Sequence, residues 1–164
     1  MFLNGCFEIK EIDKVAIDPK NPSVKVTNKI FSKVSRILAK SDSNKIEVIF
    51  DVNSDLFVSK EGDKIELLIT DSPFTSPTDT TINSGIFDLE NLTELDFIKN
   101  YEYVMHGTIF HSGLEGNEIF IYASFGGLLM KYYGFVKEVT MEDIKLDKKI
   151  LLMIKKKSGD LNKK

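Results

Sequence analysis

The chain has few of the residues from which metal and thiol sites are built. Its 164 residues include one cysteine, Cys6, and two histidines, His106 and His111. A lone cysteine cannot form an intramolecular disulfide, so nothing here indicates an oxidising compartment. A structural zinc site needs more ligands than these three residues supply. The two histidines are five residues apart and are expected on opposite faces of an extended strand, which excludes a shared metal ion.

Long apolar runs are also missing. The longest candidate, Ile150 to Ile154, is far shorter than the roughly 20 residues of a membrane-spanning helix. The N-terminus lacks the basic start of a secretory signal, and Asn4, Gly5 and Glu8 interrupt any apolar core there. We therefore expect one soluble intracellular domain with no membrane contact, because a chain of this length can bury a sufficient core.

Motifs for catalysis and phosphate binding are missing too. The sequence contains no Gly-x-x-x-x-Gly-Lys-Ser/Thr loop and no Gly-x-Ser-x-Gly elbow. Carboxylates are plentiful, but their spacing assigns none of them to an acid/base pair. Arg36 is the one arginine, which weakens any case for bidentate phosphate recognition. An enzyme is therefore the weakest hypothesis, and neither a cofactor nor a small-molecule substrate is expected.

The residues that are present favour short strands. Apolar and charged residues alternate over 7–12, as in a half-buried strand, and strands are also predicted over 45–51, 64–70, 102–111, 118–125, 127–133 and 149–155. Residues 30–40 fit either a helical face or a strand, and periodicity leaves both open. Gly126 and Gly127 mark a sharp bend or a close backbone approach, and residues 111–117 are expected to form a turn. Short strands at near-regular spacing are typical of an all-β barrel or sandwich.

Two stretches are expected to be irregular. Between Asp13 and Asn28 the apolar signal is sparse and Pro19 and Pro22 occur, so we predict a long basic loop. Between Thr70 and Asn100 the sequence has two Ser-Pro pairs and a run of Thr, Asp and Asn. Loops of this length inside a compact domain are uncommon and are usually functional or disordered.

Charge is unevenly distributed although the net charge is only −3. Eight basic residues lie between positions 14 and 45, against Asp18 and Asp42. Such zones are more often solvated surface, but small β-barrels also bind single strands with a basic groove and exposed aromatic residues. Phe120 and Tyr122 are expected on one strand face, and Tyr101 and Tyr103 on another. The candidate nucleic-acid-binding residues are Lys14, Lys20, Lys25, Lys29, Lys33, Arg36, Lys40 and Lys45.

Segments along nearly the whole chain resemble one family. It is the small subunit, eighth in order of size, that the eukaryotic nuclear RNA polymerases I, II and III share. The run Ser-Phe-Gly-Gly-Leu-Leu-Met, preceded by Tyr-Glu-Tyr-Val-Met, is the specific part of the resemblance. The matching segments are residues 7–13 (FEIKEID), 34–37 (VSRI), 51–53 (DVN), 62–64 (GDK), 101–105 (YEYVM) with Gly107, 122–131 (YASFGGLLMK) and 151–155 (LLMIK).

This resemblance implies an all-β fold, an antiparallel β-barrel of two OB-fold-like halves with a long irregular loop at about 70–100. The barrel would span residues 1–156 as one domain, followed by a lysine-rich, disordered tail at 157–164. It also implies a strand at 30–40. The loop after Asp13 is longer than is usual in the family, and so is the C-terminal tail.

The resemblance further implies a non-catalytic, nuclear subunit that docks chiefly on the largest polymerase subunit and supports assembly. The docking element would be Gly126, Gly127, Leu128, Leu129 and Met130. Weak, non-specific binding of single-stranded DNA would fall on about residues 13–48. The alternative hypothesis is a free OB-fold protein that binds single-stranded nucleic acid, for which binding should be strong and salt-dependent.

Overall fold

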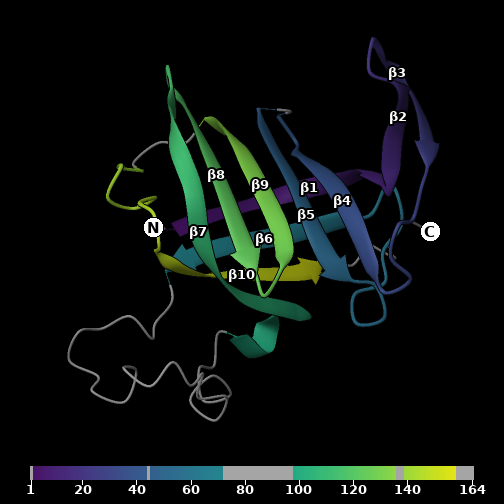
Figure 1. Cartoon of the computed structure of the whole chain (residues 1–164). Coiled ribbons are helices and arrows are strands. Elements are labelled where there is room, and N and C mark those ends of the chain that lie inside the picture. Colours follow the sequence, from purple (N-terminus) through teal and green to yellow (C-terminus); the bar gives the residue numbers. More distant parts are fainter. Residues whose placement is uncertain (1, 44, 72–97, 136–138, 158–164) are drawn as a thin grey trace, which may run out of the picture.

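The computed structural model describes residues 2–43, 45–71, 98–135 and 139–157, and these residues form a closed, eight-stranded barrel (Figure 1). Every neighbouring pair of strands is antiparallel. The prediction of an all-β antiparallel barrel is therefore confirmed. In order around the barrel the strands are β1 (Phe2–Ile12), β4 (Val34–Ser41), β5 (Ile46–Asn53), β9 (Leu128–Phe135), β8 (Glu118–Phe125), β7 (Tyr103–Glu115), β10 (Lys149–Lys156) and β6 (Lys64–Asp71).

Side chains that point inward fill the barrel. Phe50, Ile37, Ile69 and Ile121 are fully buried there, each from a different strand. Inward and outward residues alternate along the strands, as a barrel of this size requires. A smaller apolar cluster, formed by Leu68, Leu151 and Met153, packs apart from this core with Ile98, Tyr101 and Val104 against it.

The strands predicted at 45–51, 64–70, 118–125 and 149–155 are present to within two residues at each end. The ambiguous stretch 30–40 is a strand from Val34, as the family resemblance implied. Residues 98–100 of the predicted long loop form a short 3-10 helix, η2 (Ile98–Asn100). Residues 72–97 of that loop and residues 158–164 of the lysine-rich tail lie outside the described residues.

The prediction of a long loop at 13–28 is wrong. These residues form a hairpin of β2 (Lys14–Asp18) and β3 (Asn21–Thr27), a separate two-stranded sheet that projects from the barrel (Figure 1). Val15, Val24 and Val26 alternate with polar residues as strand residues do, but the face they form is exposed. Pro22 is tolerated because β3 has a free edge, where a missing N–H breaks no ladder.

The strand after residue 102 is also longer than predicted. β7 continues to Glu115, so the expected turn at 111–117 is reduced to a tight turn at Gly116. The pairing of β7 with β8 shifts register between Ile109 and His111, and this bulge reverses which side chains point outward. His106 and His111 therefore both lie on the outer face, and the prediction of opposite faces is wrong.

The aromatic residues considered for nucleic-acid binding lie on different sides of the barrel wall. Phe120 and Tyr122 share the outer face of β8, as predicted, and their rings lie 6.2 Å apart. Tyr103 instead belongs to the barrel core, whereas Tyr101 packs on the outer cluster. The expectation that Tyr101 and Tyr103 share a face is wrong because β7 begins at Tyr103, so strand alternation does not include Tyr101.

Candidate docking site

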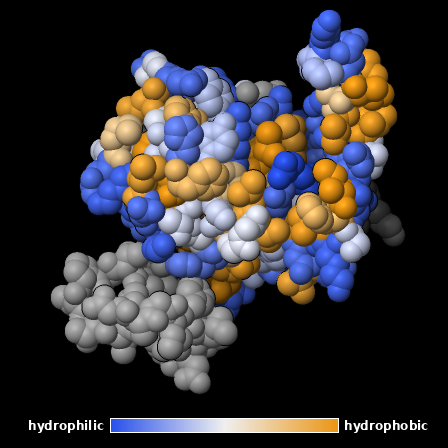
Figure 2. Space-filling model, viewed as in Figure 1, coloured by the Kyte–Doolittle hydropathy of each residue, from blue (hydrophilic) through white to orange (hydrophobic). Residues whose placement is uncertain are grey.

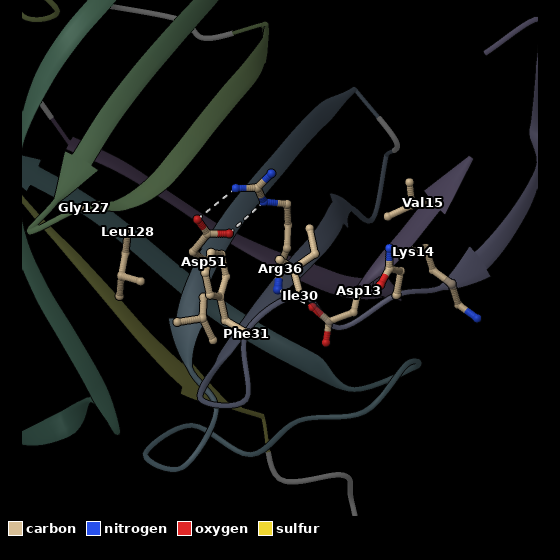
Figure 3. Close-up of a pocket in the computed structure, with 11 residues that line it drawn as sticks. Asp13, Lys14, Val15, Ile30, Phe31, Arg36, Asp51, Gly127 and Leu128 are labelled. Atoms are coloured by element: carbon tan, nitrogen blue, oxygen red, sulfur yellow. Dashed lines mark hydrogen bonds and ion pairs between the residues drawn. The ribbon is translucent and has the colours of Figure 1, made fainter. Parts of the chain in front are cut away.

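A cleft of about 450 Å³ lies where the base of the hairpin meets β4, β5 and the turn between β8 and β9 (Figure 3). These segments are distant in sequence but adjacent in the fold, because β4 pairs with β5 and β5 pairs with β9. The residues that line the cleft are Asp13, Lys14, Val15, Asn28, Ile30, Phe31, Val34, Arg36, Asp51, Gly127 and Leu128.

An ion pair between Arg36 and Asp51 lies at the centre of this site. The two residues are opposite each other on β4 and β5, and the guanidinium donates from Nε and Nη2 to the two carboxylate oxygens at 2.8 and 3.0 Å. Asp51 is only 6% exposed, whereas the side chain of Arg36 is 58% exposed. The hydrogen bond to Asp51 raises the pKa of Arg36 above its usual value.

Asp51 also holds the β8–β9 turn in place. The backbone N–H of Leu129 donates to Oδ2 of Asp51 at 3.1 Å. One buried carboxylate therefore connects β4, β5 and the start of β9. Asp51 occurs in a segment that carries the family resemblance, but no role was predicted for it from the sequence.

Asp13 fastens the base of the hairpin to β4. Its backbone N–H donates to the carbonyl of Arg36 at 2.8 Å, and its Oδ1 accepts from the N–H of Arg36 at 2.9 Å. The N–H of Asn28 closes the hairpin by donating to the carbonyl of Asp13 at 2.7 Å. Asp13 adopts a φ of 53°, a conformation that aspartate tolerates better than most residues.

The predicted docking element is this β8–β9 turn. Gly126 and Gly127 have φ values of 63° and 100°, so a sharp bend at the glycine pair is confirmed. Leu129 is 44% exposed and Leu128 is half-buried against the core. Met130 is buried inside the barrel. The turn therefore presents Gly126, Gly127 and Leu129 outward, and Met130 anchors it from within.

Most of the predicted basic residues are ion-paired. In the part of the chain that the structure describes, Lys20 and Lys45 have no carboxylate partner, and Lys29 donates to the hydroxyls of Ser35 and Ser54. The positive charge of this zone is therefore largely neutralised. The pairs are Lys14–Glu61 at 3.8 Å, Lys25–Glu11 at 2.7 Å, Lys33–Asp55 at 3.7 Å, Arg36–Asp51 at 2.8 Å and Lys40–Glu47 at 3.3 Å.

Exposed apolar side chains surround the cleft, and the sequence reasoning missed them. Ile30 and Phe31 lie between the hairpin and β4 (Figure 3), and the exposed fraction of Phe31 is 65%. The hairpin adds Val15, Ile17, Val24 and Val26. Figure 2 shows apolar surface gathered on the projecting hairpin and beside its base. The alternation of these valines with lysine was the signal that could have revealed them.

The cleft combines apolar and charged side chains. It offers apolar walls and the remaining N–H donors of an exposed guanidinium, and its lining residues include no serine, cysteine or histidine. Among the described residues, no group of three or more His, Cys, Asp or Glu side chains is arranged to hold a metal ion. No helix in the described ranges is long and apolar enough to cross a membrane.

The structure defines the chain as a closed antiparallel β-barrel with a cleft around a fixed ion pair. The chain belongs to the RNA polymerase Rpb8 family, whose model matches residues 20–156. The names of similar proteins are consistent with this family. The chain is 34% identical to proteins of Caenorhabditis briggsae and Caenorhabditis elegans, each named as a probable DNA-directed RNA polymerases I, II, and III subunit RPABC3. These alignments cover 82% and 84% of this chain, and 89% and 91% of the relatives.

A plant relative extends the comparison. The chain is 30% identical to the Arabidopsis thaliana DNA-directed RNA polymerases II, IV and V subunit 8B, over 88% of this chain and 93% of the relative. A solved structure of the molybdate-binding protein ModG aligns with a TM-score of 0.32 and 8% identity, over 93% of this chain and 89% of that one. This last likeness is too low to carry an argument.

Proposed function

We propose that this protein is a non-catalytic structural subunit of the nuclear DNA-directed RNA polymerases I, II and III. The family match, together with relatives that align over about nine-tenths of their own length, is the observation that supports it most strongly. The relatives bear the names of shared polymerase subunits. A cleft with exposed apolar side chains at its rim agrees with a role in assembly.

The proposed partner is the largest polymerase subunit, and the proposed contact is the β8–β9 turn. Two features of the turn suit it for docking. Asp51 holds it rigidly through the N–H of Leu129, so little conformational entropy is lost when a partner binds. Leu129 also presents an apolar side chain to solvent beside the cleft, where it can be buried by a neighbouring surface.

Co-purification of the full-length tagged protein from nuclear extract, with partners identified by mass spectrometry, tests this proposal. The wild-type protein should recover the largest subunit, and Leu129→Asp should lower that recovery at least about tenfold because a charge would be buried at the contact. Leu114→Asp is the matched control, since Leu114 is similarly exposed at the far end of β7. Recovery of no polymerase by the wild-type protein would refute the assignment.

Weak single-stranded DNA binding is a second proposed property. It is favoured by Lys20, Lys29 and Lys45, which have no carboxylate partner among the described residues. With three phosphate contacts, the logarithm of the binding constant should fall with the logarithm of the salt concentration with a slope of about −2. Eight contacts would give a slope of about −6. We expect micromolar or weaker affinity for a labelled oligonucleotide at physiological salt. A steep slope with nanomolar affinity would instead favour a dedicated single-strand-binding protein.

A further inference from the structure

The β2–β3 hairpin pairs with no strand of the barrel. Among the described residues its two strands pair only with each other, and every residue of β3 is exposed. An isolated two-stranded hairpin is at best marginally stable in water, so one that keeps an apolar face needs a covering surface. The family model matches from residue 20 onward, which leaves β2 outside the matched region.

One face of the hairpin is aliphatic. Val15 lies opposite Val26 across the two strands, and alternation along β3 places Val24 on the same side as Val26, while Ile17 lies at the register shift between Ala16 and Asp18 and is exposed as well. These four side chains are between 43% and 60% exposed. Ile30 and Phe31, which line the cleft at the base of the hairpin, are also exposed. Several exposed apolar side chains gathered in one region are typical of an interaction site.

The hairpin also has an open edge. In the described sheets β3 hydrogen-bonds to β2 on one side and to no strand on the other. The N–H and C=O groups along that free edge are a template for an added strand, which is how β-augmentation recognises extended peptides. Pro22 removes one donor near the tip and leaves the rest of the edge available.

The charges around the hairpin indicate the chemistry of its partner. Lys14 and Lys25 are paired with Glu61 and Glu11, but Lys20 at the tip and Lys29 at the base have no carboxylate partner among the described residues. Two uncompensated cations flanking an apolar face favour a partner with acidic residues beside its apolar ones. The apolar face of the hairpin itself is aliphatic and offers no aromatic platform for base stacking, so this face favours a polypeptide, whereas the two lysines can contact either an acidic segment or phosphate.

We propose that the hairpin binds an extended segment of another polypeptide of the polymerase, in which apolar and acidic residues alternate. The segment adds a third strand at β3, covers the aliphatic face and sets its acidic residues near Lys20 and Lys29. This inference rests on the proposed function for the identity of the assembly, but it concerns a surface separate from the β8–β9 turn.

Site-specific photocrosslinking in the assembled polymerase tests the proposal. A photoreactive phenylalanine analogue replaces Val24 in the full-length tagged protein, and the polymerase purified through the tag is irradiated. The cross-link should map to a protein segment with alternating apolar and acidic residues. The same probe at Leu114, at the far end of β7, is the control and should not cross-link to that segment.

Each outcome decides between the alternatives. Recovery of polymerase with a Val24 cross-link to nucleic acid, or with none to protein, overturns this inference and leaves the proposed function intact. Recovery of no polymerase at all refutes the proposed function, and this inference with it. As a second measurement, Ile17→Glu with Val24→Glu should reduce the polymerase retained in a high-salt wash at least about fivefold relative to Leu114→Glu. Equal retention would contradict the proposal.

Discussion

At the scale of single residues, the site depends on how the charge of Asp51 is compensated. The carboxylate is nearly buried, and it accepts two hydrogen bonds from Arg36 and one from the N–H of Leu129. Burying a carboxylate is unfavourable unless it is paired, so the native state tolerates Asp51 because Arg36 is present. The ion pair therefore serves chiefly to fix the position of the β8–β9 turn.

Replacing Arg36 should consequently lower the stability of the protein, and a second substitution at Asp51 should restore part of that stability. Arg36→Ala is expected to lower the free energy of unfolding by about 2 kcal/mol, because it leaves Asp51 buried without its counter-charge. Adding Asp51→Asn should restore about half of this loss, since the amide is neutral and its oxygen still accepts from Leu129. Urea denaturation of the two variants measures both values.

The control for this prediction is an exposed ion pair. Lys33 and Asp55 are 3.7 Å apart with both side chains well exposed, so Lys33→Ala should change stability by less than about 0.5 kcal/mol. If Arg36→Ala with Asp51→Asn is less stable than Arg36→Ala alone, compensation of the buried charge is not the reason for the pair.

His106 gives a pH dependence with a definite sign. Burial lowers the pKa of His106, and the positive charge of Lys149 lowers it further. The unfolded chain, in which histidine titrates near 6.5, therefore binds more protons than the folded chain below that pH. Stability should be full above about pH 6.5 and should fall as the pH drops from there toward the folded pKa. Thermal denaturation between pH 7.5 and 5.5 measures this change.

Replacement of the two histidines separates their contributions. His106→Gln should remove the part of the pH dependence between pH 7.5 and 5.5 that His106 produces, whereas His111→Gln should retain it. An unchanged pH profile in His106→Gln would show that other groups cause the decline.

At the scale of elements, the sequence predicted strands where alternation follows the barrel wall. Residues 118–125 were predicted as one strand, and β8 has those bounds, with half-buried and buried side chains alternating along it. The hairpin was missed because the valines of 14–27 face solvent and their pattern is diluted by two prolines. The bulge in β7 could not be predicted either, because the inserted residue, Phe110, is apolar like Ile109 before it and nothing in the sequence marks it as an insertion. The β8–β9 turn lies next to the Arg36–Asp51 pair because of the order of the strands in the barrel. Alternation of residues along a strand does not reveal that order.

Gly107 shows how one element constrains its neighbour. A Cβ at this position would lie 2.5 Å from the carbonyl oxygen of Ser124 and 2.5 Å from a ring carbon of Phe125. Because that oxygen belongs to the backbone of the neighbouring strand, Gly107→Ala must displace β8. We expect a loss of about 2–3 kcal/mol in the free energy of unfolding, measured by urea denaturation.

A glycine with open surroundings is the matched control. Gly116 has a φ of 64°, and a Cβ there meets nothing within 4 Å. Gly116→Asn should change stability by less than about 1 kcal/mol, because asparagine tolerates this conformation. Comparable losses in the two variants would show that conformation, rather than the close approach at Gly107, sets the cost.

At the scale of the whole molecule, the barrel and the hairpin have different roles. Each barrel strand has a paired neighbour on both sides, so the barrel has no open edge and encloses one core. No residue of β2 or β3 belongs to that core. The barrel therefore accounts for folding, whereas the hairpin contributes exposed surface.

Deletion of the hairpin should leave the barrel intact. Asp13 and Asn28 are already joined by a 2.7 Å hydrogen bond, so a Gly-Ser pair can replace residues 14–27 without stretching the chain. The lost ion pairs with Glu11 and Glu61 are at the surface and contribute little. The free energy of unfolding should change by less than about 1 kcal/mol, with the β-type circular dichroism spectrum of the barrel retained.

Deletion of β10 is the contrasting case. Its residues 149–156 pair with both β6 and β7, and removing them opens the barrel and exposes a core that includes Ile150, Leu152 and Ile154. That variant should fail to unfold cooperatively, because the remaining strands cannot close around the core. If deletion of the hairpin instead abolished cooperative unfolding, β2 and β3 would be part of the folding unit. Their exposed valines would then be explained by the stability of the chain itself, and a docking strand from a neighbouring polypeptide would not be needed to account for them.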